Sequence, residues 1–322
     1  MAKPLLEVRN LCVQFSPGVN VLDKLSFSLD RGETLGIVGE SGCGKTLAVS
    51  ALVGLLPPGG RITGGQILFE GQDLSRLNPK QLRSLRGRRI SMIFQHSAAS
   101  LNPVYRIGTQ MRETLRLHQK LSPGEETRVC AEALRRVGLS MPETRLRQFP
   151  HQLSSGQCQR VMIALALLST SSLLIADEPV SALDVTVRPQ ILGLLRTFRQ
   201  ETGASIVLIS HDMGAVAGNA DKVLVMYAGR PAEYGDAKAV LSAPLHPCTR
   251  SLLSCVPRSD RDTVFPPMEG APPSLDALPA GCRFAPRCPR RQAVCQAQRP
   301  PRITRGGRTV YCHLPMWPGE GI

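Results

Sequence analysis

The eight residues Gly39–Thr46 constrain the fold of this chain more than any other segment. They read Gly-Glu-Ser-Gly-Cys-Gly-Lys-Thr and fit the pattern G-x-x-x-x-G-K-[ST]. The apolar run Leu35–Val38 before them is typical of a buried strand, and Leu47–Leu56 after them has a helical pattern. A glycine-rich turn between a strand and a helix directs backbone N–H groups inward, and this arrangement cradles phosphate oxygens.

Two side chains of this loop have predicted chemical roles. Lys45 is expected to reach the β- and γ-phosphates of a nucleotide, and Thr46 to offer its hydroxyl to Mg²⁺. An alternative is a glycine-rich turn without a ligand, which the flanking strand and helix disfavour. We interpret Cys43 as a small filler of the loop rather than a redox switch. The residues expected to contact nucleotide are Gly39, Ser41, Gly42, Cys43, Gly44, Lys45, Thr46 and Leu47.

A second apolar run, Leu173–Ala176, ends in the acidic residues Asp177 and Glu178. A carboxylate at the C-terminal end of a parallel strand lies beside the phosphate loop, so Asp177 is predicted to approach Mg²⁺. Glu178 is predicted to polarise the attacking water. An acidic pair after a strand is also common at solvated strand ends, and the phosphate loop upstream is what favours the catalytic interpretation.

Residues 1–235 read as alternating strands and helices, which predicts an α/β domain with a mainly parallel sheet. Alternating apolar and polar residues predict an antiparallel β subdomain at Leu5–Phe15 and Ile67–Phe69. A helical pattern between about 97 and 168 predicts an inserted helical subdomain. Further buried strands are expected at Ile90–Phe94, Ile206–Ile209 and Val223–Met226.

Two helices of the inserted part have predicted starts. Ser122-Pro123-Gly124-Glu125 is a capping box, and Gly138 is expected to end the helix that it begins. Ser154 and Gln157 form a second box, which leaves an exposed helix N-terminus suited to an anion. The apolar faces are predicted at Val129, Ala133, Leu134 and Val137 in the first helix, and at Val161, Met162, Leu165 and Leu168 in the second.

The composition and the lengths of the apolar runs indicate the cellular compartment in which the chain is expected. The longest apolar run near the middle, Val161–Leu168, is far shorter than the ~20 residues of a membrane-spanning helix. The first residues lack the apolar stretch of a secretory signal, so a cytosolic location is expected. Ten cysteines in a cytosolic chain argue against a disulfide framework. The net charge of +14 is compatible with phosphate ligands, a membrane surface, nucleic acid or a solvated surface.

The segment Leu153–Gln157 reads Leu-Ser-Ser-Gly-Gln and resembles the LSGGQ signature of the ABC ATPases. Ser181–Asp184 is similar to the D-loop of that family. Gln95 resembles its Q-loop glutamine and His211 its switch histidine, each after a predicted strand. Phe15 lies where the family has an aromatic residue under the adenine. The resemblance covers about residues 5–235.

The resemblance implies ATP as the ligand and a head-to-tail dimer with a second ABC ATPase subunit, identical or homologous. Ser154 and Gly156 are then expected to touch the γ-phosphate of ATP held by the partner, with Gln157 and Asp184 also at the nucleotide. Gln95 is expected to join Thr46 and Asp177 at Mg²⁺, and His211 to balance charge during hydrolysis.

For single residues other interpretations stand beside these: a helix cap for Ser154, a surface histidine for His211, a polar loop residue for Gln95, and core packing for Phe15. Two positions depart from the family pattern. Ser155 replaces the first signature glycine, and Cys158 follows Gln157. Activity is expected to survive, because the second glycine, Gly156, is kept.

Residues 236–322 are predicted to form a C-terminal extension, with a proline-rich linker over Val256–Ala280 and a tail rich in Cys and Arg. Cys282, Cys288, Cys295 and Cys312 suit a [4Fe–4S] cluster or a tetrahedral zinc ion, and binding no metal is the third possibility. Eight arginines from Arg283 to Arg308 are expected to lower the thiol pKa values or to face membrane phosphate.

Three segments resemble one branch of the family, the oligopeptide/dipeptide/nickel importer ATPases: Leu101–Pro103, Pro244–Thr249 and the tail around Cys282–Pro289. In that branch such a tail is similar to one that holds an iron–sulfur cluster. The resemblance implies an ATP-hydrolysing subunit that powers uptake of peptides, or alternatively of nickel or metal chelates. It implies a peripheral subunit on the cytoplasmic face of the inner membrane, with permease subunits and an extracytoplasmic substrate-binding protein as partners.

Two other functional classes remain as alternatives. A soluble ABC ATPase acting on nucleic acid usually has two cassettes in one chain or a long coiled-coil insertion, so no nucleic-acid partner is expected for this single cassette. A scaffold that does not hydrolyse ATP is disfavoured by the presence of Lys45, Asp177, Glu178 and His211.

Overall fold

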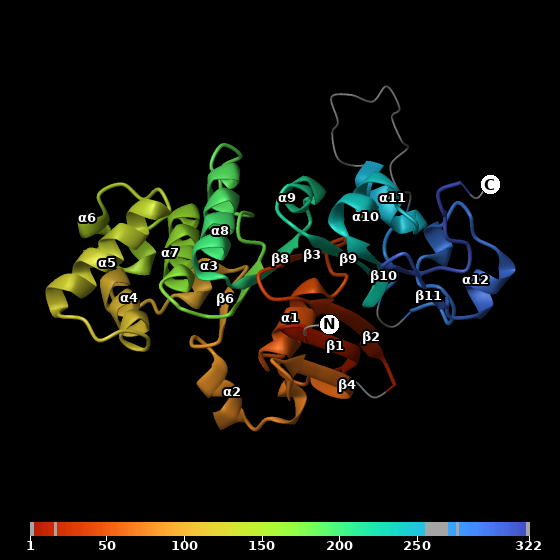
Figure 1. The fold of residues 1–322 in the computed structure, drawn as a ribbon, viewed down its shortest axis with the longest axis horizontal. Coiled ribbons are helices and arrows are strands. Elements are labelled where there is room, and N and C mark those ends of the chain that lie inside the picture. The colour runs from red at the N-terminus through yellow and green to blue at the C-terminus, as the bar shows by residue number, and fades with distance from the viewer. Residues whose placement is uncertain (1–2, 16–17, 255–269, 275–276, 320–322) are drawn as a thin grey trace. The chain divides into compact units, whose positions relative to one another are not determined.

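The fold is that of a computed structural model, which describes residues 3–15, 18–254, 270–274 and 277–319 (Figure 1). The chain divides into two compact units, residues 1–77 with 210–322 and residues 78–209. Each unit is considered by itself below. In the described ranges, no helix combines the length and the apolar character needed to cross a bilayer.

The first unit contains an antiparallel sheet with the strand order β2-β1-β4-β5. Its strands are β1 (Leu6–Gln14), β2 (Asn20–Leu29), β4 (Arg61–Phe69) and β5 (Gln72–Asp73). Leu6 lies opposite Leu29 on one side and Phe69 on the other. Alternate apolar side chains of β1 are buried, as the sequence predicts for a half-exposed strand.

A second set of strands in this unit has the order β11-β12-β10-β9-β3. β3 (Thr34–Val38) pairs in parallel with β9 (Lys222–Tyr227), and β10 (Arg230–Asp236) continues the sheet antiparallel to β9. All five residues of β3 are buried, which explains its uninterrupted apolar sequence. Helices α1 (Lys45–Leu52) and α9 (Met213–Ala217) follow β3 and β8 along the chain.

The C-terminal elements attach to β10. They are α10 (Ala237–Ser242), α11 (Pro247–Ser254), α12 (Ala293–Ala297), β11 (Arg302–Arg305) and β12 (Arg308–Tyr311). Glu233 of β10 is fully buried and accepts hydrogen bonds from the backbone N–H groups of Leu245 and His246 at 3.0 Å. Arg308 of β12 donates to the same carboxylate at 2.6 Å. β10 runs one residue past the boundary predicted at 235, and most of the predicted linker Val256–Ala280 lies outside the described residues.

The second unit contains the parallel strands β8 (Ser205–Ser210), β7 (Leu173–Asp177) and β6 (Ile90–Ile93), in that order. All three buried strands predicted here are therefore present. The helices of this unit are α2 (Pro79–Leu85), α3 (Ser97–Ser100), α4 (Ile107–Arg116), α5 (Pro123–Arg136), α6 (Pro142–Arg147), α7 (Ser155–Leu167) and α8 (Arg188–Thr202).

Helix α5 begins and ends as predicted, and the predicted apolar face is confirmed in part, since Leu134 and Val137 are buried. Ser122 accepts from the backbone N–H of Glu125, and the Glu125 carboxylate accepts from the backbone N–H of Ser122 at 2.9 Å. Buried positions include Glu126, Cys130 and Leu134, whereas the predicted Val129 is only half-buried. Glu126 is buried beside them and accepts a bidentate ion pair from Arg116 of α4, at 2.6 and 2.8 Å.

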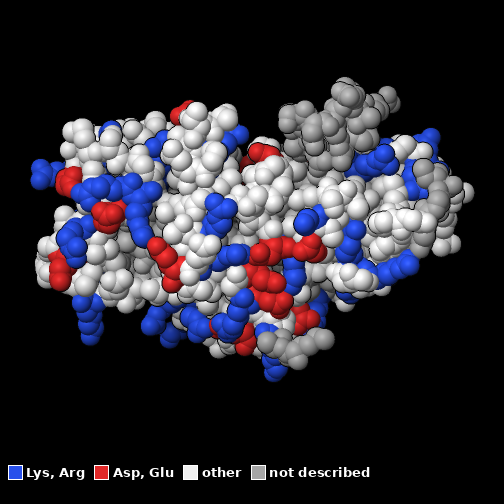
Figure 2. All heavy atoms as spheres, turned by 45° about the horizontal axis from the view of Figure 1, so that its top comes forward, with Lys and Arg blue, Asp and Glu red and all other residues white. Residues whose placement is uncertain are grey.

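Charged side chains of both signs lie among uncharged ones on the face in view, and several acidic side chains gather near its middle. Figure 2 shows Lys and Arg there interspersed with acidic and uncharged side chains. Such interspersion is typical of a solvated surface.

Candidate nucleotide-binding site

The predicted phosphate loop lies between β3 and α1, as its pattern requires. Lys45 is 6% exposed, and its Nζ donates to the carbonyl oxygens of Gly39 at 2.8 Å and Glu40 at 3.0 Å. The lysine therefore crosses the inside of the loop. Thr46, the next residue, is exposed in the first turn of α1.

Gly39 lies where only a glycine fits. Its φ is 157°, and a Cβ there would lie 2.3 Å from the carbonyl oxygen of Met226 and 2.6 Å from the Cys43 Sγ. Cys43 is itself buried, and burial raises the pKa of its thiol although Lys45 opposes the increase. A buried thiol of raised pKa is unreactive, which supports the interpretation of Cys43 as a filler.

The same unit carries Phe15 and His211. The Phe15 ring follows β1 and is 37% exposed, so it does not pack in the core and the core interpretation is wrong. His211 is exposed directly after β8, and the next residue, Asp212, caps helix α9 by accepting from the Gly214 N–H at 2.8 Å.

The second unit carries the acidic pair at the end of β7. Asp177 is 1% exposed, and Glu178 follows it with a φ of 48°. A left-handed backbone at a non-glycine residue stores roughly 1–3 kcal/mol of strain and is concentrated at functional sites. The Glu178 N–H donates to the carbonyl of Ile209 at 3.1 Å, which fixes the residue to the end of β8. Gln95 is half-buried two residues after β6.

Helix α7 begins at the signature segment with the predicted capping box. The Gln157 N–H donates to Ser154 Oγ at 3.3 Å, and the Ser154 N–H donates to Gln157 Oε1 at 3.0 Å. A Cβ at Gly156 would lie 3.2 Å from the carbonyl oxygen of Ala182, so the helix tip packs closely on the Ser181–Asp184 segment. Asp184 and Ser154 are exposed, which leaves this edge accessible.

The two departures from the signature pattern have different surroundings. Ser155 is exposed at the first position of α7. Cys158 is 2% exposed and its thiol donates to the carbonyl of Pro150 at 3.5 Å, so the residue fills a position inside the helical unit.

Sequence reasoning missed Gln159, which is fully buried in α7. Its Nε2 donates to the Glu178 carbonyl at 3.0 Å, and its Oε1 accepts from the Ala182 N–H at 3.0 Å. One side chain thus joins the signature helix to the acidic residue and to the following loop. The sequence feature that could have revealed this role is a polar glutamine, two residues after Gln157, on the buried face of the predicted helix.

The candidate residues divide between the two units. Phe15, Gly39–Leu47 and His211 belong to the first unit, and Gln95, Ser154–Gln157, Asp177, Glu178 and Asp184 belong to the second. Within the first unit the loop is assembled around Lys45, and within the second the signature helix contacts the Glu178–Asp184 segment.

The four C-terminal cysteines, Cys282, Cys288, Cys295 and Cys312, line one pocket together with His246 and His313. Over the described part of the chain, however, no three His, Cys, Asp or Glu side chains are arranged to hold a metal ion. The predicted iron–sulfur or zinc site is therefore not confirmed. Burial raises the pKa of Cys282 and Cys288, and it raises that of Cys312 to about 11.

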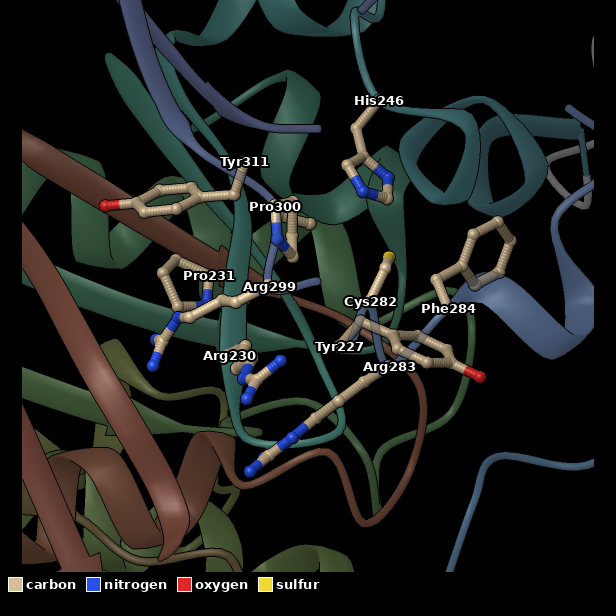
Figure 3. Close-up of a pocket in the computed structure, with 11 residues that line it drawn as sticks. Tyr227, Arg230, Pro231, His246, Cys282, Arg283, Phe284, Arg299, Pro300 and Tyr311 are labelled. Carbon is tan, nitrogen blue, oxygen red and sulfur yellow. The ribbon is translucent and has the colours of Figure 1, made fainter. Parts of the chain in front are cut away.

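The expected lowering of these pKa values by arginines does not prevail, because burial outweighs it; Arg290 nevertheless lowers the pKa of Cys288. Other arginines of the tail bind elsewhere. Arg283 donates to the carbonyls of Ala228 and Asn20, and Arg299 donates to Asp23 at 2.9 Å. Figure 3 shows Arg230, Arg283 and Arg299 around a second pocket, which Cys282 borders. Asp23 is the common acceptor of Arg230 at 2.8 Å and Arg299, and lies 3.6 Å from Arg283.

Comparison with known proteins gives matches in both parts of the chain. Residues 22–181 match the family described as ABC transporter, and residues 232–295 match the oligopeptide/dipeptide transporter C-terminal region. The chain is 45% identical to the dipeptide transport ATP-binding protein DppD of Bacillus subtilis (strain 168), over 96% of this chain and 94% of that protein. It is 46% identical to the oligopeptide transport ATP-binding protein OppD of Salmonella typhimurium (strain LT2), over 98% of this chain and 95% of that protein.

A solved structure has the same fold. It is the dimeric structure of a post-hydrolysis state of the ATP-binding cassette MJ0796 bound to ADP and Pi, which covers 72% of this chain and 98% of its own. The TM-score is 0.65 at 24% identity, which shows the ABC ATPase fold, a mixed sheet with helices. With relatives matched along nearly their full length, this chain belongs to the family of ABC transporter ATP-binding subunits and carries the C-terminal region of the oligopeptide/dipeptide transporters.

Proposed function

We propose that this chain is the ATP-hydrolysing subunit of an importer that takes up peptides. The observation that carries the proposal is the combination, in one chain, of the Gly39–Thr46 phosphate loop and the oligopeptide/dipeptide transporter C-terminal region. The names of the two relatives, a dipeptide and an oligopeptide transport ATP-binding protein, support peptides as the cargo. We take residues 1–235 as the nucleotide-binding domain and 236–322 as the C-terminal extension.

The proposed chemistry is phosphoryl transfer to water, which needs positioning and charge neutralisation. Lys45 binds the β- and γ-phosphates, Glu178 orients the water, and His211 balances charge at the γ-phosphate. The Thr46 hydroxyl and the Asp177 carboxylate are oxygen donors of the kind that Mg²⁺ prefers, and Gln95 joins them. Mg²⁺ bound there supplies positive charge to the β- and γ-phosphates. Phe15 lies under the adenine, and its exposed ring supports this role.

The active form is proposed to be a dimer in which each ATP is held by two subunits. Ser154, Gly156 and Gln157 at the α7 N-terminus contact the γ-phosphate bound to the partner's loop, and Asp184 lies at the same interface. Exposure of Ser154 and Asp184 supports this arrangement, since both are accessible to another subunit. The positive end of α7 favours an anion.

The transporter would place this chain peripherally on the cytoplasmic face of the inner membrane. Permease subunits and an extracytoplasmic substrate-binding protein are the proposed partners. The test is to purify the chain with the membrane proteins that copurify with it, reconstitute them in liposomes with the binding protein, and measure ATP-dependent uptake. Peptide uptake is expected. Uptake of nickel or a metal chelate without peptide would favour the alternative cargo, and salt-sensitive binding to RNA or DNA without any uptake would contradict the importer.

The four cysteines are proposed to hold a [4Fe–4S] cluster. Their convergence on one pocket supports the proposal, because four thiolates are the usual ligands of such clusters. Each thiolate raises the pKa of its neighbours, and a bound cation reverses that effect by deprotonating its ligands. The cluster, when bound, supplies a redox-active group that crosslinks the tail.

Protein purified without oxygen is expected to be brown and to contain iron and sulfide in equal amounts. The Cys288→Ser variant should lose both, whereas Cys130→Ser, at a buried helix position in the other unit, should keep both. Colourless protein with one zinc per chain, or with no metal, would contradict the cluster.

A further inference from the structure

An arginine of the C-terminal extension contacts the phosphate loop. The Arg287 Nη1 donates to Glu40 Oε2 at 2.7 Å, and Glu40 is the second residue of the Gly39–Thr46 loop. The side chains are 7% and 19% exposed, respectively, so this is not a solvated surface pair. A charge-assisted hydrogen bond in such surroundings is stronger than one at the surface.

Arg287 is held in place by its own surroundings. Its Nη1 also donates to the Tyr227 hydroxyl at 3.1 Å, and its guanidinium lies 5.8 Å from the centre of that ring. The Tyr227 ring meets Phe284 edge-on at 5.0 Å, and Phe284 is 2% exposed. The arginine therefore comes to the loop already oriented, and ordering its side chain costs little further entropy.

Glu40 is held from two directions. Lys45 binds its backbone carbonyl, and Arg287 binds its carboxylate. A carboxylate in a loop that binds phosphate is unfavourable, because like charges repel over several ångströms in a partly desolvated site. The ion pair neutralises this carboxylate and fixes its direction.

We propose that Arg287 is a positioning residue of the nucleotide site: it neutralises Glu40 and holds it away from the phosphates, so the C-terminal extension completes the phosphate loop. The inference rests on the proposed role of Gly39–Thr46 in binding ATP. Cys288, which lines the four-cysteine pocket, is the next residue in the sequence. The tail is thus attached to the nucleotide site at the point where its thiols converge.

The experiment uses the full-length chain and a double-mutant cycle with the neutral substitutions Arg287→Met and Glu40→Gln. The dissociation constant of Mg-ATP is measured by calorimetry, and kcat and KM are measured for hydrolysis. Arg287→Met is expected to weaken binding and raise KM about tenfold, with kcat changed less than about twofold. In the Glu40→Gln background the same change should weaken binding less than about twofold, because no carboxylate remains to be neutralised.

Arg287→Lys keeps the charge and is expected to stay within about threefold of the parent affinity. The matched control is Arg291→Ala, since Arg291 is exposed in the same segment and its side chain donates a long, 3.4 Å hydrogen bond to the Pro286 carbonyl. This control should leave the affinity unchanged.

Two results would overturn the inference. Equal weakening in both backgrounds would mean that Arg287 acts without Glu40. A lower melting temperature for Arg287→Met with an unchanged dissociation constant would mean that the pair only attaches the tail. The Lys45→Ala variant distinguishes a failure of this inference from a failure of the proposed nucleotide site. If Lys45→Ala bound ATP as tightly as the parent, Gly39–Thr46 would not be the nucleotide site, independently of the result for Arg287.

Discussion

The buried side chain of Gln159 in α7 is hydrogen-bonded to the backbone of Glu178, with 3.0 Å between Nε2 and the carbonyl oxygen. Glu178 has a left-handed backbone, and the same carbonyl also accepts from the Ser181 hydroxyl at 3.1 Å. The proposed catalytic carboxylate is therefore carried by a strained residue that the signature helix holds in place. The strain is maintained only because several hydrogen bonds fix it.

Replacing Gln159 with Ala should lower kcat about tenfold and the free energy of unfolding by about 2 kcal/mol, because two hydrogen bonds to partly buried backbone groups are lost. Steady-state hydrolysis and urea unfolding measure the two effects. Gln200→Ala, at an exposed position of α8, is the control and should change neither. Full activity in the Gln159→Ala variant would show that Glu178 does not depend on this contact.

Glu178→Gln should keep ATP binding and abolish hydrolysis, because an amide cannot take up the proton of the attacking water. ATP should then hold two subunits together, and size-exclusion chromatography with Mg-ATP should show a dimer with this subunit or its homologous partner. Hydrolysis at the parental rate would exclude Glu178 as the base.

Gly156→Ala should reduce hydrolysis strongly while the chain still folds. The added Cβ would lie 3.2 Å from the Ala182 carbonyl oxygen, which displaces the helix tip by a few tenths of an ångström. Because a misplacement of about 1 Å at a reacting site can lower rates about a hundredfold, this smaller shift is expected to lower hydrolysis about threefold to tenfold. ATPase assays combined with thermal melting test this, and loss of the melting transition would instead indicate a folding defect.

Acid should remove a stabilising contribution that Asp23 makes. Burial alone would raise its pKa, but hydrogen bonds from Arg230 and Arg299 outweigh burial and lower it. The folded state therefore binds the proton of Asp23 less tightly than the unfolded state does. The contribution of Asp23 to the free energy of unfolding is complete above the unfolded pKa of about 4. It is lost as the pH falls through the lowered pKa of the folded state.

Asp23→Asn should lower the free energy of unfolding by about 3 kcal/mol at pH 7, because it leaves buried arginines without their counter-charge. The difference between parent and variant should shrink below about pH 4, as urea unfolding at a series of pH values would show. A difference independent of pH would mean that the Asp23 carboxylate is not the source.

Much of the fold could be read from local pattern. The strands at Leu35–Val38, Leu173–Ala176 and Val223–Met226 form because a strand buried on both faces has an uninterrupted apolar sequence. The capping boxes at Ser122 and Ser154 form because their hydrogen bonds span only three residues. β2, β10, β11 and β12 were not predicted, although each pairs with a strand close to it in the sequence. The two glycines Gly306 and Gly307 join β11 to β12 and are a hairpin signal that the sequence analysis missed. The polar sequences of these strands lack the apolar run by which the buried strands were recognised.

The amino-acid sequence by itself determined the phosphate loop, the signature helix and the acidic strand end, because each depends on residues close together along the chain. Only the tertiary structure decided that Gln159 supports Glu178 and that Arg287 reaches Glu40, 247 residues away. It also decided that Arg283 binds backbone carbonyls and that Arg299 binds Asp23. The packing of the folded chain decides which acceptor lies within reach of a long side chain. The spacing of residues along the sequence does not encode that acceptor.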